Sequence, residues 1–244
     1  VNVLSSMLFL ISIAAVYAAT GTVNLAQLSL RLAELPDAVS LVLQLMLLTT
    51  FCIKAAVFPL SLWLPDSYPT APAPVTAVFA GLLTKVGVYA ILRGQSLLFP
   101  DGPLTDLLLV AALLTMLVGV LGAIAQSDIK RMLSFTLVSH IGYRIFGVGL
   151  APVGGYSGAI VYVVHHITIQ TALFLVVGLA ERRGGSTSLL KLGGLARLSP
   201  LLGVLFFVPA MNLAGIPPMS GFLGKVGLVD AGIQVGTPLA YILV

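Results

Sequence analysis

The sequence predicts an all-α polytopic membrane protein. Hydrophobic residues make up 59% of the 244 residues, whereas charged residues make up only 8%. Soluble domains carry roughly 25% charged residues, so this composition excludes an ordinary globular core. Apolar runs of about 20 residues, the length needed to cross a bilayer, follow one another along the whole chain. Short segments rich in proline, glycine and charge join them, as is typical of turns between membrane helices.

Seven runs are long and apolar enough to be membrane helices, and an eighth begins near the end of the sequence. In order they are Val3–Ala19, Val39–Leu62, Pro74–Leu92, Leu104–Ala125, Met132–Leu150, Tyr156–Leu179 and Pro200–Gly236, followed by a run from Thr237 that is cut short. The sequence starts without a methionine or a charged leader. We therefore expect residues 1–244 to be a single transmembrane domain, an interior fragment that lacks N- and C-terminal helices.

Prolines predict that two of these helices are broken. Pro59 interrupts the second run, and Pro217 and Pro218 interrupt the seventh. Proline removes a backbone donor and clashes with the preceding helical turn. In hydrocarbon such a break is tolerated only where protein or a wet cavity surrounds it. Interrupted segments at corresponding positions are typical of inverted repeats in ion transporters, so we expect an inverted-repeat helix bundle with two broken helices around a central pathway.

Three lysines lie in or beside the apolar runs: Lys54, Lys85 and Lys225. A charge at the bilayer centre costs ~2.5–3.5 kcal/mol on insertion scales, so each lysine is a candidate functional residue. A buried lysine can exchange its proton, whereas an arginine cannot. The alternative for Lys225 is a side chain that snorkels to the membrane surface. For Lys54 the alternative is a bond to a carbonyl freed by Pro59.

Two adjacent histidines, His165 and His166, lie in the middle of the sixth run. Histidine titrates near neutral pH, which suits proton transfer. Adjacent side chains point about 100° apart on a helix, so we expect one histidine to face the pathway and the other to be a hydrogen-bonded packing residue. A metal site is disfavoured because no Cys, Asp or Glu stands nearby. His140 and Arg144 share one helix face. Arg144 could line a wet surface, or contact lipid phosphate or another subunit.

The buried cations lack acidic partners within the runs, apart from Asp230. Unpaired charge in a low dielectric is costly, so we expect a partner carboxylate in a helix outside this fragment or on a neighbouring subunit. The lone Cys52 excludes an internal disulfide. The absence of a basic run disfavours nucleic acid as a partner. No motif suggests a flavin, haem or iron–sulfur cofactor, and no nucleophile–base arrangement suggests covalent catalysis.

The loops are asymmetric in positive charge. Those on one side, near Asp66, Asp128–Arg131 and Glu181–Ser199, contain six cations, whereas the other side contains only Arg31 and Arg93. The six are Lys130, Arg131, Arg182, Arg183, Lys191 and Arg197. The positive-inside rule predicts that this richer side is cytoplasmic. We interpret the segment Asp128–Arg131 as a solvated turn that anchors a helix end there.

Three segments resemble the signatures of the antiporter-like membrane subunits of respiratory complex I, membrane-bound hydrogenases and Mrp-type sodium/proton antiporters. They are Lys54–Val75, Asp128–Gly142 and Leu213–Lys225. The string Trp63–Val75 followed by Leu82–Tyr89 is most similar to the D-type subunits of the Mrp-type antiporters. The resemblance implies about fourteen helices built from two inverted repeats, of which this chain would be an interior part.

The same resemblance implies roles for individual residues. Lys54, Lys85 and Lys225 match the family's buried lysines, the first of which pairs with a glutamate on a preceding helix. His165 matches a common histidine. Two positions depart from the family: Gln170 stands where many relatives keep a lysine, and Arg144 is unusual after Gly-Tyr. Because glutamine cannot titrate, His166 or water would substitute for the missing lysine.

The function implied is that of a cell-membrane subunit of a multi-subunit sodium/proton antiporter. Its lysines and histidines would form a hydrated proton relay across the middle of the bilayer, and its partners would be other membrane subunits, lipid, Na⁺ and H⁺. One alternative is a proton-pumping subunit of a redox complex, either NADH:quinone oxidoreductase or a hydrogenase, driven by electron transfer in another arm. A second alternative is a passive scaffold whose charges merely pair.

Overall fold

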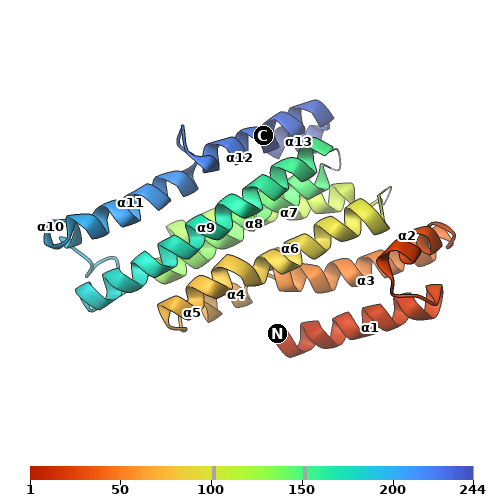
Figure 1. Ribbon diagram of the computed structural model, residues 1–244, viewed down its shortest axis with the longest axis horizontal. Coiled ribbons are helices and arrows are strands. Elements are labelled where there is room, and N and C mark those ends of the chain that lie inside the picture. The colour runs from red at the N-terminus through yellow and green to blue at the C-terminus, as the bar shows by residue number, and fades with distance from the viewer. Residues whose placement is uncertain (101–102, 151–152, 244) are drawn as a thin grey trace.

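The computed structural model describes residues 1–100, 103–150 and 153–243. Within these ranges the chain is helical, without strands beyond one isolated bridge between Asp128 and Ser188. The long helices lie side by side in an elongated bundle (Figure 1). The predicted all-α fold is therefore confirmed. Asp101 and Gly102, which belong to a predicted turn, and Val244, the last residue of the truncated run, lie outside the described residues.

The helices follow the predicted runs closely, with several subdivisions. In chain order they are α1 (Asn2–Thr20), α2 (Leu25–Ala33), α3 (Asp37–Ala55), α4 (Trp63–Ser67), α5 (Ala73–Val78), the π-helix η1 (Phe79–Leu83), α6 (Thr84–Arg93), the π-helix η2 (Gly94–Leu98), α7 (Thr105–Ile124), α8 (Ile129–Gly149), α9 (Val153–Gly184), α10 (Leu195–Leu198), α11 (Pro200–Ala214), α12 (Ser220–Val235) and α13 (Pro238–Leu243). The short helix α2 was not predicted. It forms because Asn24 caps its first turn, accepting from the Ala26 N–H at 3.0 Å, and because Leu28 and Leu32, one turn apart, are buried.

Among the described residues, five helical stretches are long and apolar enough to cross a membrane: α1, α3, Ala73–Leu98, α7 and Gly154–Gly184. They correspond to five of the seven predicted runs. The run Met132–Leu150 forms α8, which at 21 residues has the length of a span but is more polar than the others. The run Pro200–Gly236 forms α11 and α12, each of which is too short to span alone. The chain is thus a multi-pass membrane protein.

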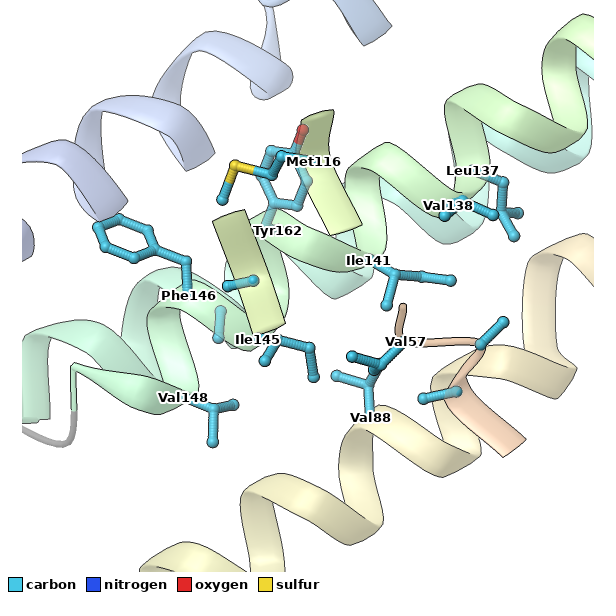
Figure 2. Close-up of a cluster of buried hydrophobic side chains, with 14 of the residues drawn as sticks. Val57, Val88, Met116, Leu137, Val138, Ile141, Ile145, Phe146, Val148 and Tyr162 are labelled. Atoms are coloured by element: carbon cyan, nitrogen blue, oxygen red, sulfur yellow. The ribbon is translucent and has the colours of Figure 1, made fainter. Parts of the chain in front are cut away.

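Helix α8 is the centre of the bundle, because 16 of its 21 residues are buried. It packs along α7 and α9 and also contacts α4, α6 and α12. Figure 2 shows Ile141 and Ile145 of α8 near Val57 and Val88 from the neighbouring segments. Since protein surrounds α8, its polar side chains face other side chains and not lipid. This explains how a helix too polar for a lipid-exposed span remains stable in the membrane.

The second run is interrupted where Pro59 was predicted to break it. Helix α3 ends at Ala55, and Ala56 adopts a left-handed conformation with φ of 60°. The chain is not helical again until Trp63. The break is only partly buried, with Pro59 and Leu62 exposed. Side chains satisfy two backbone groups at the break: the Trp63 indole N–H donates to the Ile53 carbonyl at 3.0 Å, and the Phe58 N–H donates to the Thr115 hydroxyl at 3.0 Å.

The seventh run is interrupted in a similar way at Pro217 and Pro218. Helix α11 ends at Ala214, Gly215 follows with φ of 85°, and α12 begins at Ser220. Figure 1 shows this interruption beside the unbroken helix α9 and within its length. The interruption therefore lies partway along the bundle and not at its end, and Pro217 and Pro218 are exposed in the described part of the chain.

Candidate functional site

Polar side chains gather inside the bundle where α6, α8, α9 and α12 meet. The buried members are Lys85, His140, Arg144, Tyr162, His165, His166 and Gln170, and the half-buried Lys225 joins them from α12. None of the aspartates and glutamates that the structure describes is buried. The cluster therefore contains basic and neutral groups only. Such groups are stable in a low dielectric only when hydrogen bonds or dipoles compensate their charge.

His140 connects α8 to α9. Its Nδ1 shares a short hydrogen bond with the hydroxyl of Tyr162, and its ring lies 5.1 Å from that of His166, centroid to centroid. The ring of Tyr162 lies 5.6 Å from that of His165. Three imidazoles and one phenol thus form a continuous group. Every member of it can donate or accept a hydrogen bond.

His165 faces the interruption between α11 and α12. Its Nδ1 shares a hydrogen bond of 2.9 Å with the Ser220 hydroxyl, which donates to the Asn212 side-chain oxygen at 3.2 Å. The same oxygen accepts from the Gly221 backbone N–H at 2.9 Å. We expected one histidine of the adjacent pair to be a packing residue. The two rings turn to different sides: His165 faces Ser220 of α12, and His166 faces His140 of α8, where neither of its nitrogens has a hydrogen-bond partner among the described residues. The division into one pathway and one packing histidine stays a prediction.

Lys225 is held by the end of a helix. Its ammonium donates to the carbonyl of Ala214 at 2.8 Å and lies 5.3 Å from the centroid of the Tyr143 ring. The last carbonyls of a helix lack intrahelical partners and form the negative end of its dipole, so α11 stabilises this cation. Asp230 accepts from Gln234 at 2.8 Å and forms no salt bridge with Lys225. Lys225 therefore points to the break between α11 and α12.

Lys85 and Lys54 lie on the other side of α8. Lys85 is only 4% exposed, and its ammonium donates to the Ala80 carbonyl in the π-turn η1. Its charge is close enough to interact with those of Arg144 and His166. Lys54 is partly buried in the last turn of α3, where the helix dipole also favours a cation. Lys54 forms no hydrogen bond or salt bridge with another residue of the described ranges.

A close helix contact places the end of α3 next to α6. A Cβ on Gly87 would lie 2.6 Å from the backbone nitrogen of Ala55, the residue after Lys54. Gly87 is two positions from Lys85, so the two lysines come from adjacent helices. The candidate residues therefore form a row that runs from α3 through α6, α8 and α9 to α12.

Arg144 is 0% exposed in the middle of this row. Its Nε donates to the His140 carbonyl at 3.0 Å, but its two terminal nitrogens have no partner among the described residues. The interpretations that Arg144 contacts lipid phosphate or another subunit are therefore wrong. Gln170 donates to the Leu133 carbonyl at 2.9 Å, and its own carbonyl oxygen is likewise unpartnered in the part of the chain described. Buried polar atoms are rarely left unsatisfied, so this region is suited to hold water.

Several residues of this buried polar cluster were not predicted from the sequence. His140 and Arg144 were singled out as ionisable but were not assigned a role, and Tyr162 was not considered at all. One signal was available: Tyr162, His166 and Gln170 are spaced four residues apart and therefore share one face of α9. The contacts of Asn212 and Ser220 had no such signal, because they depend on how the break folds.

The fold and the site define a class: a multi-pass α-helical membrane protein with two interrupted helices and a buried row of basic side chains between them. The family model for the transmembrane region of NADH:quinone oxidoreductase and Mrp antiporters matches residues 1–244. The chain belongs to this family.

Relatives within the family are similar over nearly the whole chain. It is 45% identical over 234 residues to the D-type subunit of the Na⁺/H⁺ antiporter of Alkalihalophilus pseudofirmus and 40% identical over 238 residues to that of Bacillus subtilis. These alignments cover 95% and 96% of this chain but 48% of each relative. The chain thus spans about half the length of the curated relatives it matches.

Solved structures show the same fold. The Mrp complex from Dietzia sp. DQ12-45-1b matches with a TM-score of 0.93 and 42% identity, over 98% of this chain and 45% of the other. Respiratory complex I from Thermus thermophilus matches with a TM-score of 0.86 and 27% identity, over 98% of this chain and 52% of the other. The Mrp subunit is therefore more similar than the complex I subunit in both sequence and structure.

Proposed function

We propose that the chain is part of a membrane subunit of a multi-subunit Na⁺/H⁺ antiporter, in which the buried row conducts protons across the middle of the bilayer. The observation that carries this proposal is the continuity of titratable side chains between the two helix interruptions. Ring contacts join the imidazoles of His140, His165 and His166 through Tyr162, Lys225 lies over the Tyr143 ring beside His140, and the buried Lys85 stands on α6, which packs against α8. The relatives named as Na⁺/H⁺ antiporter subunits support the choice of ions.

The chemistry of the row follows from its contacts. Lysine and histidine can each bind and release a proton, and a charge gained by one group changes the proton affinity of the next. Arg144 keeps its charge and so acts as a fixed positive field beside Lys85 and His166. Gln170 cannot titrate, but its amide and the imidazole of His166 lie one turn apart on α9 and can hold water between them. Lys54 would join the relay once a carboxylate from elsewhere in the protein faces it.

The proposal extends to orientation and partners. The end of the bundle that carries Lys130, Arg131, Arg182 and Arg183 would face the cytoplasm, because positive loops are retained there. The remaining partners would be other membrane subunits and the lipid bilayer. The described part of the chain offers few buried oxygen ligands, so the Na⁺ site would lie elsewhere in the complex.

The second candidate is a proton-pumping subunit of a redox complex. It is favoured by the likeness to complex I from Thermus thermophilus and to the archaeal membrane-bound sulfane sulfur reductase, at 27% and 28% identity. The identities of 40% and 45% to antiporter subunits are clearly higher. The antiporter is therefore the better supported interpretation of the same row of residues.

The proposal is tested by sodium-driven exchange in inverted membrane vesicles that contain the intact complex. A preset pH gradient should collapse when Na⁺ is added without a respiratory substrate. Lys225→Ala should abolish this collapse, whereas Lys191→Ala, a charge-matched change in an exposed loop, should not. Proton movement that requires an electron donor and does not depend on Na⁺ would instead show that the chain belongs to a redox-driven proton pump.

A further inference from the structure

A second polar feature lies apart from the row, at the Lys/Arg-rich end of the bundle. Here the segment Pro69–Pro74 and the C-terminal part of α9 line a cavity of about 750 Å³ that opens to the surface. Its charged lining residues are Lys130, Glu181 and Arg182. A cavity of this size is large enough to hold many water molecules. The proposed relay does not use any of these residues.

The cavity wall contains an ion pair that is unequally buried. The Lys130 ammonium lies 2.6 Å from a carboxylate oxygen of Glu181, and the two side chains are 7% and 39% exposed. Lys130 stands in the first turn of α8, where the helix dipole disfavours a cation. The Glu181 carboxylate therefore stabilises Lys130 from α9. Because it is the more exposed partner, Glu181 is also the group that meets water from the cavity.

One face of α9 leads from this ion pair toward the row. Glu181, Val177, Phe174 and Gln170 follow the spacing i, i−4, i−7 and i−11, so they share a face, and His166 continues it one turn further. Glu181 and Gln170 are separated by about 16 Å along the helix axis. Between them Phe174 and Val177 are both fully buried and apolar. These two residues form a dry interval, which we call the apolar gate.

On the neighbouring helix α8, the residues that contact Glu181 and Gln170 lie much closer together than Glu181 and Gln170 do on α9. Gln170 donates to the carbonyl of Leu133, which lies only ~4.5 Å further along α8 than Lys130. The Ser134 hydroxyl donates to the Lys130 carbonyl at 2.8 Å. Lys130 thus starts about one helical turn from the Gln170 contact, and its side chain reaches Glu181. Water that passed the apolar gate would meet the free carbonyl oxygen of Gln170 and then His166.

We propose that this cavity is the port through which protons pass between the Lys/Arg-rich face and the buried row. Glu181 in the cavity wall is the proton-exchanging group, Phe174 and Val177 are the apolar gate, and Gln170 is the first polar group behind the gate. The inference rests on the proposed proton-conducting function. Arg182 in the cavity wall, and the Arg131–Asp66 pair on the same face at 2.9 Å, are the other charged groups at this end.

The proton-exchanging role of the Glu181 carboxylate is tested with the variant Glu181→Gln in the intact complex. The measurement is the Na⁺-induced collapse of a pH gradient in inverted vesicles. The exchange rate should fall about tenfold or more, because a proton-exchanging group is lost, while the half-saturating Na⁺ concentration stays unchanged. Glu181→Asp should restore much of the rate. Asp106→Asn, an exposed carboxylate in the first turn of α7 at the opposite end, is the charge-matched control and should leave the rate unchanged.

The gate is tested by Phe174→Ala, measured as passive decay of a pH gradient without Na⁺. Removal of the ring should admit water and accelerate the decay at least about threefold, because apolar constrictions close pathways by excluding water. Leu173→Ala is the control, since Leu173 is equally buried on the same helix but turned about 100° away.

Two outcomes would overturn the port: a wild-type exchange rate in Glu181→Gln while Lys225→Ala abolishes exchange, or equal decay in the two alanine variants. Absence of exchange in the native complex would refute the antiporter function itself. The leak comparison between Phe174→Ala and Leu173→Ala would still decide whether the port exists.

Discussion

The ammonium of Lys225 on α12 donates a 2.8 Å hydrogen bond to the carbonyl of Ala214, the last residue of α11. The lysine stem also packs on the intervening turn, since a Cβ on Gly215 would lie 3.0 Å from its Cδ. The carbonyl at the end of α11 thus stabilises the charge of Lys225, for which the sequence had suggested a carboxylate partner. A hydrogen bond from an ammonium to a backbone carbonyl is weaker than a buried ion pair, and it can be exchanged for a hydrogen bond to water. A residue that binds and releases a proton requires such an exchangeable contact.

We expect Lys225→Arg to separate the charge of this residue from its ability to titrate. Arginine keeps a cation beside the end of α11 but does not release its proton. Thermal stability of the purified complex should therefore stay near the wild-type value, while Na⁺-driven exchange should fall about tenfold or more. Full exchange in Lys225→Arg would show that a fixed charge suffices and that Lys225 is not a relay group.

Gly87→Ala should destabilise the contact between α3 and α6. The added methyl group would lie 2.6 Å from the Ala55 nitrogen, and rigid backbone cannot move aside cheaply. Overpacking of this kind costs about 1–3 kcal/mol, so the melting temperature of the complex should fall. Gly94→Ala is the matched control on the same helical stretch, because nothing lies within 4 Å of its added Cβ. Equal melting temperatures for the two variants would contradict this packing.

The sequence predicted the long elements well because a bilayer imposes one simple requirement, about 20 apolar residues in a row. That requirement located α8 despite its polar residues, and proline chemistry located both interruptions. It could not find α2, whose stability depends on one cap and two buried leucines. It also placed the break in the second run at Pro59, whereas α3 already ends at Ala55, because the left-handed turn at Ala56 is not marked by a glycine.

The candidate site was predicted less completely, for a different reason. From the sequence, carboxylate side chains were expected to pair with the lysines. The structure instead satisfies Lys85 and Lys225 with backbone carbonyls at a π-turn and a helix end. The His140–Tyr162 bond joins residues 22 positions apart on separate helices, so no local pattern reveals it. Such contacts depend on packing and can be derived only once the helices are placed.

Asn212→Ala should weaken the interruption between α11 and α12. The Asn212 side-chain oxygen accepts from the Gly221 N–H at 2.9 Å and from the Ser220 hydroxyl at 3.2 Å, so it caps the start of α12 from across the break. Loss of a helix cap costs about 1 kcal/mol, within a range of roughly 0.5–2. The melting temperature should therefore decrease modestly. Asn212→Asp keeps an acceptor at the N-terminus of α12, so its melting temperature should decrease less. An equal decrease in the two variants would argue against capping.

Arg144→Met should leave the complex as stable as the wild type or more stable. The guanidinium is fully buried, and its two terminal nitrogens have no partner among the residues that the structure describes. Desolvation of such a charge is expensive, and replacing buried charges by apolar side chains of similar volume is often neutral or stabilising. Methionine is suited to the site because it fills irregular spaces. The comparison is the melting temperature of the variant beside that of Arg131→Met, which removes an exposed, ion-paired arginine and should change stability by less than about 1 kcal/mol. A large loss of stability in Arg144→Met alone would mean that the guanidinium holds a partner, such as bound water or a carboxylate, that stabilises the core of the bundle.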